Sequence, residues 1–221
     1  MKALVAHKLG MTQVFGDKGK LIPVTLVKAE TCIVAGMRSL DKDGYEAAII
    51  GYGESKNPGK ATKNQFKDLK VTPKHIKEIR LPNNLNIENS DSEEESDASE
   101  DTAPAMMKAG DKLEVSMFKP GDEVTISGTS KGKGFAGTIK RHNFHRGPKT
   151  HGSKSYRDPG SIGSMYPQKI FKGKKMAGRM GQDKVTVKKV TVVDVDVSEN
   201  LLALVGAIPG SRNSILVITG A

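Results

Sequence analysis

The sequence has one cysteine, few aromatic residues and no long apolar run. Cys32 is the single cysteine in 221 residues, which excludes a disulfide framework and a cysteine-based zinc site. Tryptophan is absent and aromatic residues make up 5% of the chain, so we expect no core built on large rings. No apolar stretch approaches the roughly 20 residues of a membrane-spanning helix, and the run at 3–6 is too short for a signal-peptide core. These absences predict a protein without a membrane segment in a reducing, cytoplasmic compartment.

Positive charge is unevenly distributed along the chain. There are 35 lysines and arginines against 25 aspartates and glutamates, a net charge of +10. Residues 128–189 hold 16 of the basic residues and only two acids, Asp158 and Asp183, for a net +14, so the remaining chain is net −4. Charge of one sign concentrated in this way indicates an oppositely charged partner rather than a particular fold.

Outside the basic segment the sequence is typical of short β-strands. Runs of β-branched residues end at turn signals such as Pro209-Gly210, and valines alternate with aspartates over 193–197. Thr72-Pro73 fits the start of one short helix over 74–80. This spacing predicts a mainly β chain with an antiparallel, closed or nearly closed barrel made of residues 1–127 and 185–221. The expected strands are 21–28, 31–37, 45–52, 113–118, 123–127, 193–197, 201–205 and 215–219.

An acidic segment interrupts the predicted barrel. Residues 88–101 contain eight aspartates and glutamates among serines, and no lysine, arginine or aromatic residue. So little apolar surface cannot offset the entropy lost on ordering, and we therefore interpret 83–110 as a disordered insertion. It is either a solvated spacer or an intramolecular mimic of nucleic acid that shields the basic segment.

The basic segment, residues 128–184, has no hydrophobic periodicity. It contains 11 glycines and three prolines between positions 128 and 181. Loops of this length are uncommon inside a compact domain. We expect this one to extend from the barrel and to be ordered by an anionic partner.

One glycine motif raises an enzymatic alternative. Gly132, Gly134 and Gly137 match GxGxxG, and Asp158 follows 21 residues later. That fingerprint requires a βαβ unit with an amphipathic helix after the third glycine. Residues 138–145 lack the apolar stripe of such a helix. A dinucleotide-binding enzyme therefore remains the alternative to a non-enzymatic protein that has no cofactor and no small-molecule substrate.

Metal binding and nucleophilic catalysis are also poorly supported. His142, His145 and His151 lie among lysines and arginines, without the carboxylate or thiolate neighbours that complete a zinc site. Cys32 lies in an apolar run and is interpreted as an inert core thiol. The sequence predicts no metal site and no catalytic residue.

The basic segment has the composition of a nucleic-acid-binding loop. Its cations are spread at short intervals, so each can meet a phosphate, and intervening glycines let the backbone approach closely. Five of the ten aromatic rings of the chain lie here, as flat faces for unstacked bases, and an irregular segment suits folded RNA better than DNA. The candidate contacts are Lys131, Lys133, Phe135, Lys140, Arg141, His142, Arg146, Lys149, His151, Lys154, Arg157, Lys172, Lys174, Lys175 and Arg179.

Several of these segments resemble a known family. They are KLGMTQVF at 8–15, GTSKGKGFAGTIKR at 128–141, PGSIG at 159–163 and FKGKKMAG at 171–178. Together they are similar to bacterial-type large-subunit ribosomal protein three, over nearly the whole chain apart from the acidic insertion.

The resemblance implies a translation-protein-type β-barrel on the large ribosomal subunit and a long extension toward the peptidyl transferase centre. It also implies direct binding of large-subunit rRNA, a role early in subunit assembly, contacts with neighbouring ribosomal proteins and no catalytic activity. It assigns residues 129–141 and 171–178 to the rRNA-binding arms. The loop tip near the peptidyl transferase centre would comprise Gly160, Ser161, Ile162, Gly163, Ser164, Met165 and Tyr166.

Two positions depart from the family pattern. Many relatives carry a methylated glutamine shortly after Gly-Ser-Ile-Gly, whereas this chain has Ser164-Met165 there and Gln168 after the proline. We therefore do not extend the modification to this chain. Many relatives also place a tryptophan where this chain has His142, which predicts weaker or pH-sensitive stacking at that position.

Overall fold

The computed structural model describes residues 2–16, 19–30, 32–67, 69, 72–80 and 109–220. Residues 83–108 of the predicted insertion lie outside the described residues, so their disorder stays a prediction, whereas residues 109–110 form a turn in which the Gly110 amide donates to the Val34 carbonyl at 2.8 Å. The chain forms two compact units, one of Met1–Gly128 with Thr186–Ala221 and one of Thr129–Val185.

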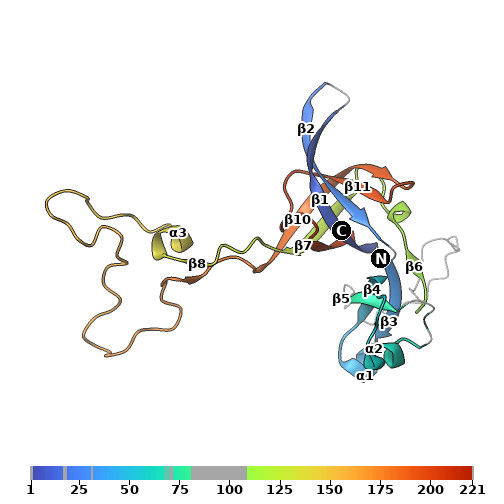
Figure 1. Ribbon diagram of the computed structural model, residues 1–221, viewed down its shortest axis with the longest axis horizontal. Helices are drawn as coiled ribbons and strands as arrows, with labels where there is room; N and C mark the ends of the chain where they lie inside the picture. Colours follow the sequence, from blue (N-terminus) through green and yellow to red (C-terminus); the bar gives the residue numbers. More distant parts are fainter. Residues whose placement is uncertain are drawn as a thin grey trace, which may run out of the picture. The chain divides into compact units, whose positions relative to one another are not determined.

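Six strands of the first unit form a closed antiparallel barrel in the order β1-β12-β7-β10-β11-β2 (Figure 1). The barrel closes because β2 pairs with β1 on one side and with β11 on the other. The buried ammonium of Lys8 on β1 donates to the carbonyls of Ile208 (2.7 Å) and Gly210 (3.2 Å), which fixes the loop before β12. The strands are β1 (Ala3–Phe15), β2 (Leu21–Ala29), β7 (Glu123–Thr129), β10 (Lys184–Asp196), β11 (Leu201–Val205) and β12 (Ile215–Gly220).

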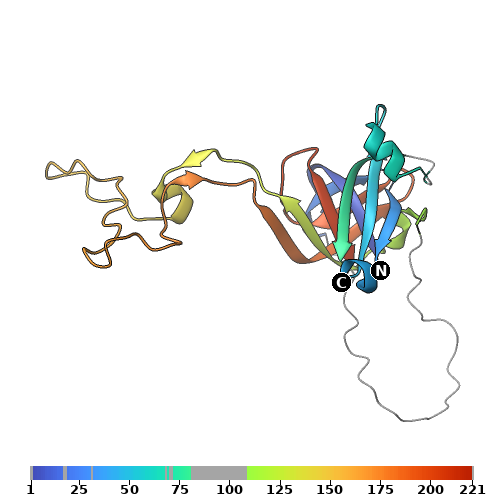
Figure 2. The same cartoon turned by 90° about the horizontal axis from the view of Figure 1, so that it is seen from below.

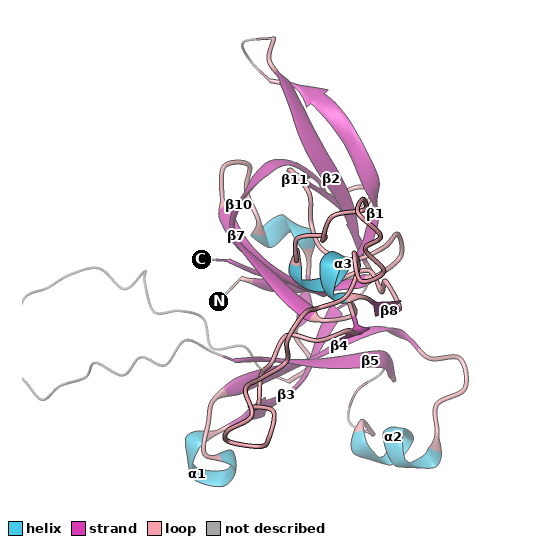
Figure 3. Cartoon of the chain, turned by 90° about the vertical axis from the view of Figure 1, so that its left-hand side faces the viewer, coloured by secondary structure: helices cyan, strands magenta, loops and turns pink. Residues whose placement is uncertain are grey.

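The other strands of the first unit form a separate four-stranded antiparallel sheet in the order β5-β4-β3-β6 (Figure 3). The prediction had assigned all these strands to the barrel, and the separate sheet is a correction. Short helices connect its strands. The elements are β3 (Cys32–Arg38), α1 (Leu40–Asp43), β4 (Ala47–Glu54), α2 (Lys60–Gln65), β5 (Pro73–Arg80), β6 (Lys112–Leu113) and the 3-10 helix η1 (Val115–Met117).

The barrel and the second sheet share one hydrophobic core. Residues 3–6 of β1 are fully buried on both faces, because the strand contributes to the barrel interior and also contacts the second sheet. The Cys32 thiol on β3 donates to the Val5 carbonyl at 3.2 Å, and the His7 and Tyr52 rings meet edge to face at 5.0 Å. Burial of apolar surface at about 25 cal/mol per Å² is the main source of stability for this unit.

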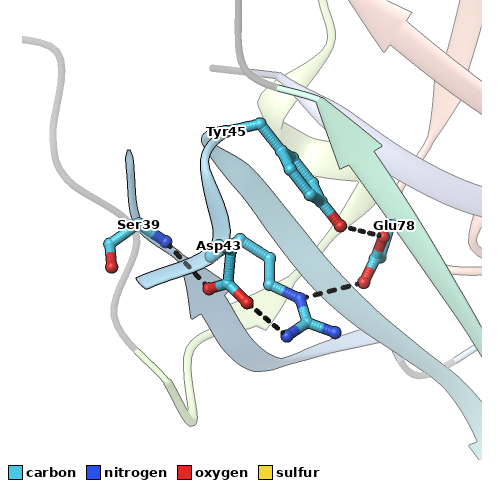
Figure 4. Close-up of polar contacts among 5 residues, drawn as sticks. Ser39, Asp43, Tyr45 and Glu78 are labelled. Atoms are coloured by element: carbon cyan, nitrogen blue, oxygen red, sulfur yellow. Dashed lines mark hydrogen bonds and ion pairs between the residues drawn. The ribbon is translucent and has the colours of Figure 1, made fainter. Parts of the chain in front are cut away.

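A surface network closes one end of the second sheet. Arg38 pairs with Asp43 (2.7 Å) and with Glu78 (3.1 Å), while the Tyr45 hydroxyl donates to the second oxygen of Glu78 at 3.1 Å (Figure 4). Gly44 adopts a left-handed conformation at the end of α1, which turns the chain from β3 back toward β4. The network ties this turn to β5 through Glu78.

The mainly β, antiparallel expectation is confirmed, but two local predictions are wrong. Residues 74–80 form strand β5 rather than a helix, because Pro73 opens an edge strand as readily as it opens a helix. The predicted strand at 113–118 is a two-residue strand followed by the 3-10 turn η1, in which the Phe118 amide donates to the Val115 carbonyl at 3.0 Å.

Candidate nucleic-acid interface

The second unit, residues 129–185, buries almost none of its 57 residues. Ala136 and Thr138 are its buried residues, at 4% and 5% exposure. By contrast, residues such as Val24, Ile126 and Leu216 in the first unit are fully buried. A segment that buries so little apolar surface gains little hydrophobic free energy to offset its conformational entropy.

The first and last segments of this unit, residues 129–136 and 178–185, run side by side (Figure 2). We call these two segments the legs, and the paired legs the ribbon. The Lys133 amide donates to the Met180 carbonyl and the Met180 amide to the Gly134 carbonyl, both at 2.9 Å. Strands β8 (Phe135–Ala136) and β9 (Gly178–Arg179) then pair antiparallel. The ribbon is thus held by backbone hydrogen bonds rather than by a core.

Gly181 is required by the close approach of the two legs. Its φ is +77°, and a Cβ there would collide with the Lys131 carbonyl oxygen. Gly132 lies against the Gln182 side chain, which a Cβ would meet at 3.4 Å. The contact at Gly132 is an ordinary van der Waals contact, whereas the clash at Gly181 is with the backbone of the paired segment. Glycine at 181 therefore has a structural explanation without a bound phosphate.

The same geometry contradicts the dinucleotide alternative. Gly137 precedes a helix, α3 (Thr138–His142), but this helix has five residues and starts from an antiparallel ribbon. The fingerprint requires a long helix within a parallel βαβ unit. The sequence had suggested no amphipathic helix at 138–145, and the short α3 satisfies the fingerprint no better.

The end of α3 is bonded to the start of the returning leg. An Arg141 Nη1–H donates to the Met176 carbonyl at 2.9 Å, and His142 Nε2 lies 3.0 Å from the same oxygen. Since a carbonyl oxygen only accepts, the histidine Nε2 carries the proton in this contact. Two predicted RNA contacts, Arg141 and His142, therefore bind their own chain.

Within the loop between the legs, a second backbone hydrogen bond joins residues distant in sequence. The Gly147 amide donates to the Tyr156 carbonyl at 3.0 Å, and the Lys149 ammonium lies 5.7 Å from the centre of the Tyr156 ring. Tyr156 is half-buried. A lysine over an aromatic face is attracted by the ring quadrupole, so this pair defines the base of the 148–155 turn.

All 14 lysines and arginines of residues 129–185 are exposed, against two aspartates, for a net charge of +12. Among the residues that the structure describes, none of these cations forms an ion pair with a carboxylate. Phe135 is 82% exposed and His142 is half-buried. The other predicted contacts are exposed, namely His151 and the twelve cations Lys131, Lys133, Lys140, Arg141, Arg146, Lys149, Lys154, Arg157, Lys172, Lys174, Lys175 and Arg179.

The predicted tip, residues 160–166, is exposed at every position. Met165 and Tyr166 are 90% and 85% exposed. The Ser161 hydroxyl donates to the Gly163 carbonyl at 2.9 Å, which folds the start of the tip on itself. The tip therefore offers one aromatic and two aliphatic side chains outward.

Comparison with known proteins now decides the family. The model of the family described as Ribosomal protein L3 matches residues 97–200. A large ribosomal subunit protein uL3 from Heliobacterium modesticaldum is 43% identical over 219 residues, covering 98% of this chain and 95% of the relative. The uL3c protein of Guillardia theta is 46% identical over 220 residues, covering 97% of this chain and 98% of the relative. The chain belongs to the ribosomal protein L3 family.

Membership of the L3 family assigns the protein to the ribosome, which is cytoplasmic in bacteria, as a structural component and not as an enzyme. The residues matched by the L3 family model include the whole second unit. Among the described residues, no helix is long and apolar enough to cross a bilayer.

Cys32 is a free, buried cysteine. Among the described residues, no group of three or more histidine, cysteine or acidic side chains could hold a metal. Burial raises the pKa of the Cys32 thiol to about 11, which keeps it protonated at neutral pH. This agrees with the interpretation of Cys32 as a core thiol.

Sequence reasoning missed two features of this L3 family unit. Met176 acts through its backbone carbonyl, and no side-chain pattern signals such an acceptor. Gly178 leaves space for the Arg141 guanidinium, since a Cβ there would lie 2.6 Å from Nη1. Because Gly178 is one of many glycines in this segment, the sequence does not show that it lies next to the Arg141 guanidinium.

Proposed function

We propose that this protein is a structural constituent of the large ribosomal subunit that binds large-subunit rRNA directly through residues 129–185. The observation that carries the proposal is the net charge of +12 on these 57 residues, only two of which are buried. None of their lysines and arginines forms an ion pair with a carboxylate among the described residues. Such a unit gains most of its stabilisation from an external polyanion.

RNA supplies that stabilisation in three ways. Phosphates accept from the exposed lysines and arginines and release condensed counterions. Backbone amides next to glycines can donate to phosphate oxygens at close range. Exposed rings such as Phe135, Tyr166 and Phe171 offer stacking faces to unpaired bases. The combination favours folded RNA, which presents both dense phosphate and splayed bases.

The first unit provides the anchor in this proposal. Its barrel, of the translation-protein type implied by the family, has a hydrophobic core of its own, so we expect it to fold without RNA. The basic loop then extends toward the peptidyl transferase centre with residues 160–166 at its tip. Early participation in subunit assembly and contacts with neighbouring ribosomal proteins belong to the same proposal.

Binding to matched RNAs tests it. The full chain is titrated with an in vitro transcript of large-subunit rRNA and with a small-subunit rRNA transcript of similar length, over a series of salt concentrations. We expect tighter binding to the large-subunit transcript and retention on large subunits after a high-salt wash. Equal affinity for both transcripts, together with release in the wash, would reject direct and specific rRNA binding.

A further inference from the structure

One carbonyl oxygen in the second unit receives two side-chain donors from adjacent residues. Arg141 Nη1 and His142 Nε2 lie 2.9 Å and 3.0 Å from the Met176 oxygen. A carbonyl has two lone pairs, so these donors saturate it. We call Arg141, His142 and the Met176 carbonyl the carbonyl clamp.

Three neighbouring features support the clamp geometry. α3 ends at His142, and Asn143 adopts a left-handed conformation with φ +58°, which turns the chain away directly after the two donors. Gly178 has no side chain and leaves room for the guanidinium. The clamp lies next to the β8–β9 pair, since Met176 precedes β9 by two residues. The two donors, the Met176 carbonyl and the space above Gly178 thus lie together at one end of the ribbon.

The clamp joins positions 34 and 35 residues apart in sequence, at the base of the loop 143–175. Closing a loop of this length costs conformational entropy that grows only slowly with its length. If the free protein already holds this loop closed, less conformational entropy is lost when RNA binds. The affinity for RNA is then higher, because the loop is preorganised.

We propose that Arg141 and His142 are positioning residues that hold the two legs of the 143–175 loop together, rather than direct contacts to RNA. This inference rests on the proposed rRNA binding for its functional consequence, although the clamp itself exists in the free protein. It reassigns two of the residues that the sequence placed among the RNA contacts, whereas the exposed Lys140 beside them keeps that role.

Two substitutions of His142 separate positioning from stacking. H142Q keeps an N–H at a similar distance from the backbone, while H142F keeps a flat ring and loses the donor. The first readout is hydrogen exchange of the 176–180 amides in the full-length free protein. We expect H142F to accelerate exchange by about threefold to tenfold, the value of one net hydrogen bond, and H142Q to remain close to wild type. Equal exchange in all three proteins would reject the clamp.

The second readout is affinity for the large-subunit rRNA transcript. We expect H142F to bind more weakly and H142Q to bind like wild type. Weaker binding by H142Q with unchanged binding by H142F would show that the ring stacks on a base, which contradicts the proposal. A thermal melt of each variant confirms that the first unit remains folded.

Arg141 is tested against its neighbour through the salt dependence of binding. R141A removes a clamp donor and should lower affinity while leaving the slope of log affinity against log salt unchanged. K140A removes a phosphate contact and should flatten that slope by about one. An equal flattening by R141A would assign it to phosphate and overturn the proposal. If the wild-type chain fails to bind the transcript, the proposed function is lost, while the exchange experiment still decides the clamp.

Discussion

The two units of this chain are stabilised in opposite ways. The first unit closes a barrel and buries one continuous core, which includes Leu4, Ile50 and Ile218. The second buries two residues and exposes fourteen cations, none of which forms an ion pair with a carboxylate among the residues that the structure describes. One sequence therefore contains a part that folds around a buried apolar core and a part that has almost no core. Substitutions should affect stability in the first and RNA affinity in the second.

The largest expected effect is on the core of the first unit. Leu204 on β11 is fully buried, and Leu204→Ala should lower the free energy of unfolding by roughly 2–5 kcal/mol. Val205→Ala, on the same strand and 37% exposed, is the matched control and should change it little. Denaturant unfolding measures both. Similar losses for the two variants would contradict the assignment of β11 to the core.

A charge substitution in the second unit should affect binding without affecting folding. Replacing Lys172, Lys174 and Lys175 together by Ala should reduce affinity for large-subunit rRNA about a hundredfold near 0.1 M salt and flatten the salt dependence by about 2–3. The control replaces the exposed Lys56, Lys60 and Lys63 of the first unit, which changes net charge equally. If the slope is the same in both triple variants, the cations 172–175 do not contact phosphate.

Cys32 reports on the integrity of the first unit. With the thiol pKa raised to about 11 by burial, the thiolate fraction at pH 8 is about a thousandth, against about a tenth at the ordinary value of 9.0. Native protein should therefore alkylate about a hundredfold more slowly than unfolded protein. Above about pH 9 the unfolded state loses its thiol proton first, so stability should fall as pH rises. Fast native alkylation at pH 8 would place Cys32 outside the core.

Gly181 tests whether the ribbon matters for binding. Gly181→Ala forces a Cβ against the Lys131 carbonyl at a positive φ, so it should disrupt leg pairing and weaken RNA binding about tenfold, through one or two lost hydrogen bonds. The melting temperature of the first unit should not change. Gly137→Ala, where φ is −67° and a Cβ meets open space, should bind nearly normally. Equal binding by both variants would show that ribbon pairing is dispensable.

The smallest expected effect concerns the acidic segment. Deleting residues 88–101 removes eight negative charges, and a segment that shields the cations of the second unit would thereby be lost. We expect the isolated protein to associate with nonspecific RNA a few times faster at low salt, because electrostatic steering increases. Stopped-flow mixing measures this rate. Identical rates for both proteins would leave the segment as a spacer.

Local sequence patterns predicted where individual strands lie better than they predicted which strands pair with one another. The strands at 201–205 and 215–219 were found from β-branched and aliphatic runs, because burial on a pleated sheet selects such residues. The strand at 3–15 was missed, and those at 32–54 were placed in the barrel, since periodicity does not specify which strands pair. Pro73 misled the helix prediction because the same residue type opens both elements.

Composition predicted the exposure of the cations in the candidate site, but not the contacts that they make within the chain. Exposed cations such as Lys133 and Lys172 follow from charge spacing alone. Arg141 and His142 belong to the same pattern, but their hydrogen bonds to the Met176 backbone depend on tertiary geometry. A sequence shows which side chains can bind phosphate, and only the fold shows which of them are already engaged.

The pairing of β1 with β12 determines when the barrel can fold during synthesis of the chain. Residues 3–7 form their ladder with 215–219, so the barrel cannot close until almost the entire chain has left the ribosome that makes it. Residues 129–185 emerge before that moment, and long-range pairings of this kind form slowly. Each newly made copy therefore exposes its most cationic part before its stable fold is complete, in a cell crowded with RNA.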